Sequence, residues 1–137
     1  LVYAMRPPAL DELGLVPALR QQVVAARTSD GRPMRVSVDA PELPQLPAAV
    51  EVAAYRIATE AVTNSARHSG TDRACVWIER HGDLLVVTVR DEGAAHGEWV
   101  PGVGLSSMRE RAAEVGGTLE VATDGHGWLV TARLPLS

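Results

Sequence analysis

The sequence of 137 residues contains no lysine and no phenylalanine, and its single cysteine is Cys75. A chain without lysine excludes every mechanism that needs a lysine side chain, including the ordinary phosphate-binding loop. One cysteine excludes an internal disulfide and a cysteine-rich metal site, and it fits a reducing, cytoplasmic setting. No stretch has the apolar length of a signal peptide or a membrane span, so we expect no direct membrane contact by this domain.

The chain begins with leucine rather than methionine, so we expect it to be part of a longer protein, whose other segments could include an anchor in the inner membrane. Its length suits one domain with a real core. Hydrophobic residues make up 46% and charged residues 22% of the sequence, as in ordinary globular domains. The formal net charge of −4 provides no global basic field, which argues against a nucleic-acid partner.

Hydrophobic periodicity and the placement of glycine and proline predict helices and strands in alternation. The helices are expected at 16–27, 48–68 and 105–115, and the strands at 34–38, 73–79, 84–91, 118–123 and 128–134. Short turns at 81–83 and 124–127 join strands into hairpins. This order predicts an α+β fold, a two-layer α/β sandwich with about three helices on one face of a mixed, mostly antiparallel sheet.

Polar side chains enter the apolar stripe of the helix expected at 48–68, near its C-terminal end. At about 100° per residue, the stripe is made of Leu46, Val50, Ala53, Ile57 and Ala61. Asn64 and His68 fall inside this stripe, and Glu60 and Arg67 border it. Polar groups buried without partners cost about 1–3 kcal/mol each. Two interpretations stay open: a polar ligand lies at this end of the helix, or the helix end projects past the core.

Asp91 ends a strand whose inward face is otherwise apolar. Leu85, Val87 and Val89 share that face, and Asp91 continues it. A buried carboxylate needs a hydrogen-bond donor, and the exocyclic amine of a purine is one candidate. The alternative is a strand-end aspartate that turns to solvent or caps the loop. Gly93, two residues later, allows the backbone to approach a ligand closely.

The segment Gly102-Val103-Gly104-Leu105 stands at the start of the helix expected at 105–115. Glycines at a helix N-terminus let backbone N–H groups and the helix dipole meet phosphate. Any loop-to-helix turn can use glycine. The segment is informative because it follows, in chain order, the polar groups around Asn64 and Asp91.

Together these segments resemble the histidine-kinase branch of the ATPase superfamily that also contains gyrase, a heat-shock chaperone and the mismatch-repair ATPase. Residues 55–68 (YRIATEAVTNSARH) are similar to the N box of the subclass whose partners are nitrate-response-type regulators. Residues 89–93 (VRDEG) resemble the first glycine box. Residues 102–105, with MRER at 108–111 and the two glycines that follow the helix, resemble the second glycine box.

The N-terminal residues resemble the link that joins the dimerisation helices of sensor kinases to their catalytic domain, because residues 10–15 (LDELGL) follow Arg6-Pro7-Pro8. The resemblance therefore implies the end of a dimerisation helix and a linker at 1–15, and an ATP-binding catalytic domain with the Bergerat-type fold at 16–137. It also implies a cognate response regulator as a partner. The phosphoacceptor histidine would lie in a dimerisation domain upstream of this chain.

The resemblance implies a role for each candidate residue. Asn64 would hold Mg²⁺ through its amide oxygen, with phosphate oxygens and water completing the site. Glu60 would polarise the incoming nucleophile, and Asp91 would accept from the adenine amine. Gly93 and the segment Gly102-Val103-Gly104-Leu105 would let a lid close over ATP. Arg67 and His68 would contact phosphate, although a solvated position explains Arg67 nearly as well.

Two departures from the family pattern leave other functions open. Ala95 stands where the first glycine box often has a further glycine, and Trp128 follows Gly127 where a threonine often helps to bind adenine. A nucleotide-binding regulatory module with weak or no catalysis is therefore an alternative. An anti-sigma-factor-type serine kinase is another, but the linker at 10–15 and the helix residues at 108–111 argue against it.

Overall fold

Five strands form one mixed sheet in the computed structural model, which describes residues 6–68, 71–92, 103–123 and 127–137. They are β1 (Arg35–Asp39), β2 (Arg73–His81), β3 (Leu84–Asp91), β4 (Thr118–Thr123) and β5 (Trp128–Pro135), in the order β1-β2-β3-β5-β4. β1 pairs with β2 in parallel, and the other three pairings are antiparallel. The mixed, mostly antiparallel sheet predicted from the sequence is confirmed.

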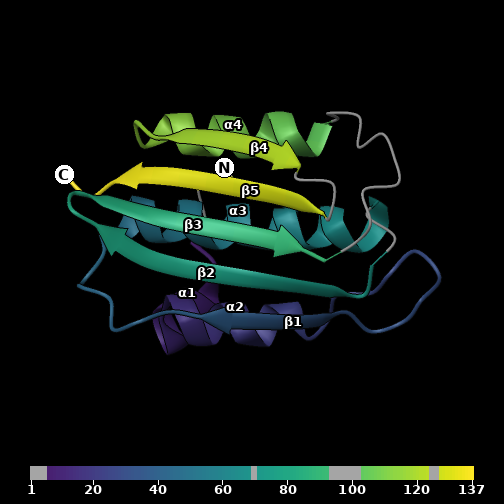
Figure 1. The fold of residues 1–137 in the computed structure, drawn as a ribbon. Helices are drawn as coiled ribbons and strands as arrows, with labels where there is room; N and C mark the ends of the chain where they lie inside the picture. The colour runs from purple at the N-terminus through teal and green to yellow at the C-terminus, as the bar shows by residue number, and fades with distance from the viewer. Residues whose placement is uncertain (1–5, 69–70, 93–102, 124–126) are drawn as a thin grey trace.

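The helices lie together on one face of this sheet (Figure 1). They are α1 (Pro8–Leu13), α2 (Leu15–Val23), α3 (Ala48–His68) and α4 (Val103–Glu114). The predicted two-layer sandwich is confirmed, with one more helix than expected among the described residues. The additional helix is α1. It begins at Pro8, and at the first helical position the missing N–H of proline costs no hydrogen bond.

Two helices have other bounds than the sequence predicts. The helix expected at 16–27 ends at Val23, because Thr28 N–H already donates to the carbonyl of Arg32 and Arg27 pairs with Pro33. α4 begins at Val103 and ends before Gly116, whose φ of 79° suits glycine. The glycine pair at 116–117 was predicted to close this helix, and it does.

The core lies between α3 and the central strands. α3 contributes the predicted stripe of small and branched residues, among them Val50, Ala53, Ile57 and Ala61, all of which are buried. It packs on β3 and β5, whose inward residues Val87, Val89 and Ala132 are buried beneath it. Burial of this apolar surface is the main stabilising contribution. It also brings the C-terminal end of α3 to the end of β3, where Asp91 stands.

Residues 6–15 are fixed to the start of α3. Nε of Arg6 donates to Oδ1 of Asp11 at 2.5 Å, and its terminal nitrogen donates to the carboxylate of Glu51. These hydrogen bonds, first to Asp11 and then to Glu51, raise the pKa of the Arg6 guanidinium. Leu10 and Leu15 join the main core cluster. Residues 6–15 are therefore packed on the rest of the fold.

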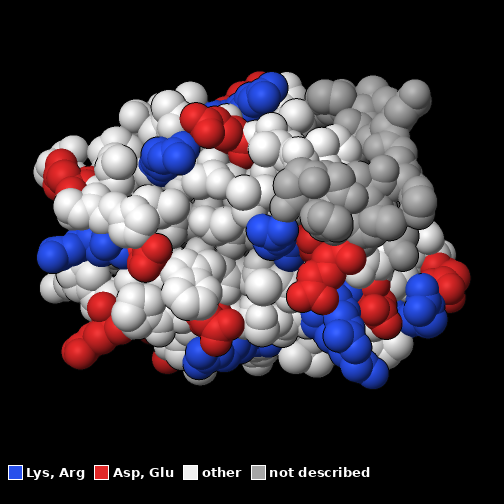
Figure 2. All heavy atoms as spheres, in the orientation of Figure 1, with Lys and Arg blue, Asp and Glu red and all other residues white. Residues whose placement is uncertain are grey.

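The opposite face of the sheet is covered by none of the helices in the described ranges. Figure 2 shows this face, with acidic and basic side chains interspersed over it. Trp77 lies on it, 48% exposed, because it alternates along β2 with the buried residues Val76 and Ile78. Within the described ranges, none of the helices has both the length and the apolar character needed to cross a membrane.

Candidate functional site

A pocket opens where the C-terminal end of α3 meets the ends of β3 and β5. Its lining consists of Ala61, Asn64, Ser65, His68, Val89, Asp91, Trp128 and Val130. Three of the candidate residues, Asn64, His68 and Asp91, therefore share one cavity although they come from different elements. The cavity measures about 10 Å³, the space of about one water molecule. A ligand larger than water must therefore displace part of this lining.

Asp91 points into the protein. It is 1% exposed and continues the inward face of Val87 and Val89. The alternative in which this aspartate turns to solvent is therefore wrong. Its Oδ2 accepts a hydrogen bond from the hydroxyl of Ser65 at 3.0 Å, and its Oδ1 accepts one from the backbone N–H of Trp128 at 3.0 Å. Two donors of the chain thus hold the carboxylate in one orientation.

Two residues of this arrangement were not singled out from the sequence as site residues. Ser65 supplies a hydrogen-bond donor to the buried carboxylate of Asp91. The sequence indicates that such a donor must exist, because a buried carboxylate needs one, but it does not identify Ser65. Gly127 is the second residue, and it lies directly against Asp91. A Cβ placed on Gly127 would come within 2.1 Å of the carbonyl oxygen of Asp91. No side chain fits at this position without moving β3 or β5.

Asn64 is half-buried at the pocket, while Arg67 and His68 are exposed. The hydroxyls of Thr59 and Thr63, on the preceding turns, donate back to carbonyls of α3, at 2.8 Å to Tyr55 and 2.9 Å to Thr59. Asn64, Ser65 and His68 are the polar residues of α3 that line the pocket. Arg67 is not among the residues that line it.

Glu60 lies one turn before Asn64 and is half-buried. Its Oε1 accepts a hydrogen bond from the hydroxyl of Ser107 on α4 at 3.2 Å. Its Oε2 is buried and has no hydrogen-bond partner among the described residues. An unpartnered buried carboxylate oxygen is costly, and Oε2 needs a donor that the described residues do not supply.

The glycine candidates lie largely outside the description. Gly93 and Gly102 fall in the range 93–102, as does Ala95, and these residues are outside the described ones. Val103 and Gly104 are the first two positions of α4, and Leu105 is 3% exposed in the core. The predicted helix that follows the glycine segment is therefore confirmed.

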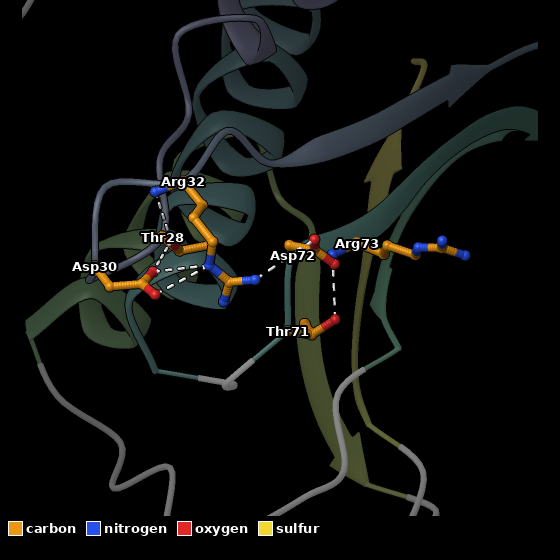
Figure 3. A network of polar contacts seen from close by, with 6 residues as sticks. All are labelled: Thr28, Asp30, Arg32, Thr71, Asp72 and Arg73. Atoms are coloured by element: carbon orange, nitrogen blue, oxygen red, sulfur yellow. Dashed lines mark hydrogen bonds and ion pairs between the residues drawn. The ribbon is translucent and has the colours of Figure 1, made fainter.

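A polar network joins the segment between α2 and β1 to the residues at the start of β2 (Figure 3). Nε of Arg32 donates to Asp30 at 3.0 Å, and the guanidinium lies 3.8 Å from Asp72. The hydroxyl of Thr28 also donates to Asp30, and this bond is the largest cause of the lowered pKa of that carboxyl. Arg35 N–H donates to the carbonyl of Asp72 at 2.7 Å. These contacts join the segment before β1 to the start of β2, next to the end of α3.

The described residues hold no group of three or more histidine, cysteine, aspartate or glutamate side chains that could bind a metal ion. A magnesium ion held by one amide oxygen, phosphate oxygens and water does fit, because Mg²⁺ prefers hard oxygen ligands and keeps several waters. The half-buried amide of Asn64 is of that type.

Comparison with known proteins gives one family. Residues 49–137 match the model of the family described as histidine kinase-, DNA gyrase B-, and HSP90-like ATPase. The signal transduction histidine-protein kinase/phosphatase DegS of Bacillus subtilis is 30% identical over 142 residues, which cover 96% of this chain and 37% of DegS. The sensor histidine kinase YxjM of the same organism is 36% identical over 106 residues, covering 75% of this chain and 26% of YxjM.

Solved structures of histidine kinases have a similar fold. The blue-light activated histidine kinase of Erythrobacter litoralis EL346 matches with a TM-score of 0.69 and 27% identity, over 90% of this chain and 42% of that one. The separate histidine kinase domain of the same protein matches with a TM-score of 0.68 and 26% identity, over 89% of this chain and 61% of that one. The chain spans about a third of the length of DegS.

Proposed function

This chain belongs to the family of histidine kinase-, DNA gyrase B- and HSP90-like ATPases, and from that premise we propose that it is the catalytic domain of a sensor histidine kinase. It binds Mg·ATP and passes the γ-phosphoryl group to a histidine on a dimerisation domain that lies elsewhere in the protein. The observation that carries the proposal is the shared pocket of Asn64, His68 and Asp91 at the end of α3.

Asp91 is the adenine contact in this proposal. Each carboxylate oxygen has two acceptor sites, so Oδ1 and Oδ2 can accept from a ligand amine while Trp128 and Ser65 hold them. A guanine ring presents a carbonyl oxygen where adenine presents its amine. The fixed, buried carboxylate of Asp91 repels that oxygen, which supports a preference for adenine over guanine.

Asn64 is the magnesium ligand and lies on the phosphate side of the site. A neutral amide oxygen suits an ion whose charge the triphosphate already balances. Mg²⁺, when bound, neutralises charge on the phosphate oxygens. Arg67 and His68 lie within one turn of Asn64 on α3 and contact phosphate from the same side. The segment 102–105 leads into α4, whose N-terminal N–H groups favour phosphate.

Glu60 accepts the proton of the incoming nucleophile. In the transfer, the bond between the γ-phosphorus and the ADP oxygen breaks and a bond from the histidine nitrogen to phosphorus forms. The proton of that nitrogen passes to the carboxylate of Glu60. No covalent intermediate on this chain is needed, so the site acts by positioning and charge stabilisation.

The response regulator is the second partner. A phosphohistidine on the dimerisation domain supplies the phosphoryl group to a receiver domain, and the nitrate-response-type subclass is the one we propose for it. Two-component signalling places these steps in the cytoplasm. The longer protein can still be anchored in the inner membrane through other segments.

Trp128 provides a direct test of ATP binding, because it lines a cavity too small for a base. The variant Trp77→Phe, Trp99→Phe leaves Trp128 as the only tryptophan. We expect its fluorescence to change saturably with ATP and Mg²⁺, since Trp128 lines the pocket that adenine would enter. GTP at equal concentration serves as the control and is expected to give a much smaller change. Absence of both a fluorescence change and a heat of binding at millimolar ATP would remove the proposed function.

A further inference from the structure

Ser107 lies where α4 meets the candidate proton acceptor. It stands in the second turn of α4, and its hydroxyl donates to Oε1 of Glu60 on α3 at 3.2 Å. Leu105 and Met108, on either side of it, are 3% and 0% exposed in the core. The contact therefore joins two helices that are packed together, and the hydroxyl has a fixed place relative to Glu60.

The two oxygens of the Glu60 carboxylate differ in their surroundings. Oε1 accepts from Ser107, whereas Oε2 is buried and has no hydrogen-bond partner among the described residues. The terminal torsion of a glutamate is broad, so the carboxylate plane is not fixed by the side chain itself. A hydrogen bond to one oxygen therefore decides where the other oxygen points.

We propose that Ser107 is a positioning residue for phosphoryl transfer: its hydrogen bond to Oε1 of Glu60 leaves Oε2, the buried oxygen without a partner among the described residues, to accept the proton of the incoming histidine. The inference rests on the proposed kinase function. The proton leaves the histidine nitrogen for Oε2 as that nitrogen bonds to phosphorus and ADP departs. Because Ser107 belongs to α4, Glu60 is oriented only while α4 is packed on α3. The helix that follows the glycine segment thereby controls the geometry of the proton acceptor.

The test uses the kinase that contains this chain together with its phosphoacceptor domain. Ser107→Ala is expected to lower kcat about tenfold, because orientation of the base is lost, while KM for ATP changes less than about twofold. Ser107→Thr keeps the hydroxyl and is expected to restore most of kcat. Ser106→Ala is the matched control: its side chain is exposed on the neighbouring position of α4, and its kcat is expected to match the wild type.

Further readouts separate positioning from a structural role. ATP affinity of this chain, measured by calorimetry, is expected to be the same in Ser107→Ala and the wild type. In a Glu60→Gln background, Ser107→Ala is expected to have no further effect on kcat, since the two residues act as a unit. An unchanged kcat in Ser107→Ala, a loss confined to KM, or fully additive losses would overturn the proposal. If the wild type binds no ATP, the proposed kinase function is wrong as well as the role of Ser107. If the wild type binds ATP and transfers phosphate normally while Ser107→Ala has no effect, only the role of Ser107 is wrong.

Discussion

Asn64→Ala is expected to abolish the magnesium dependence of ATP binding. Asn64 is the only asparagine of the chain, and its half-buried side chain lines the pocket that Asp91 closes from β3. Under the proposed function, removal of this amide oxygen takes away the protein ligand of Mg²⁺ and leaves the ion with phosphate and water only. We expect Mg²⁺ to stop improving ATP affinity and phosphoryl transfer to fall about a hundredfold or more. Calorimetric titrations with and without Mg²⁺ measure the first effect.

The control for this variant removes an amide from an exposed helical position. Gln21→Ala changes an exposed residue of α2, away from the pocket, and is expected to bind Mg·ATP like the wild type. Alanine is a good helix former, so Asn64→Ala is not expected to unfold α3. A full magnesium dependence in Asn64→Ala would show that the metal ligand lies elsewhere.

Asp91→Asn is expected to reduce the preference for ATP over GTP on the order of a hundredfold. The amide keeps one oxygen for the N–H of Trp128, and its NH₂ group can donate to the Ser65 hydroxyl in reversed polarity. The fold is therefore retained while the second acceptor for adenine is lost. Asp91→Ala leaves two donors without partners and is expected to lower the free energy of unfolding by about 2–5 kcal/mol. Competition titrations measure selectivity, and urea denaturation measures stability.

Asp39→Asn is the matched control, because Asp39 is an exposed aspartate at the end of β1. It is expected to leave both nucleotide selectivity and unfolding unchanged. Unaltered selectivity in Asp91→Asn would mean that adenine is recognised by other groups. Unaltered stability in Asp91→Ala would mean that Ser65 and Trp128 find new partners at little cost.

Much of the fold was predictable because its signals are local. Helix 48–68 and strands 84–91 and 118–123 were predicted with the bounds that α3, β3 and β4 have. Alternation of apolar residues favours an inward-facing Asp91, with a solvent-facing aspartate as the alternative, and Asp91 is buried. The prediction was wrong at residues 24–27, where hydrogen bonds to residues 32–34 end α2 early. Helical periodicity carries no information about such a turn.

The contacts that complete the site were not predictable in the same way. Ser65 reaches Asp91 across 26 positions and Ser107 reaches Glu60 across 47. Such pairs are set by the packing of α3 against the sheet and against α4, which no single segment encodes. A buried carboxylate indicates that a donor must exist, but only the packed structure identifies it. The close approach of Gly127 to Asp91 is likewise a tertiary property.

Phosphoryl transfer between separate domains tests the central claim most directly. The chain is mixed with the dimerisation domain that we propose as its partner, ATP labelled at the γ-phosphate and Mg²⁺. We predict label on the dimerisation domain, stable in base and lost in acid as phosphohistidine is, and no label on this chain, because the proposed acceptor histidine lies in that domain. Stable labelling of this chain, acid-stable label on serine, or ATP binding without any transfer would contradict the account.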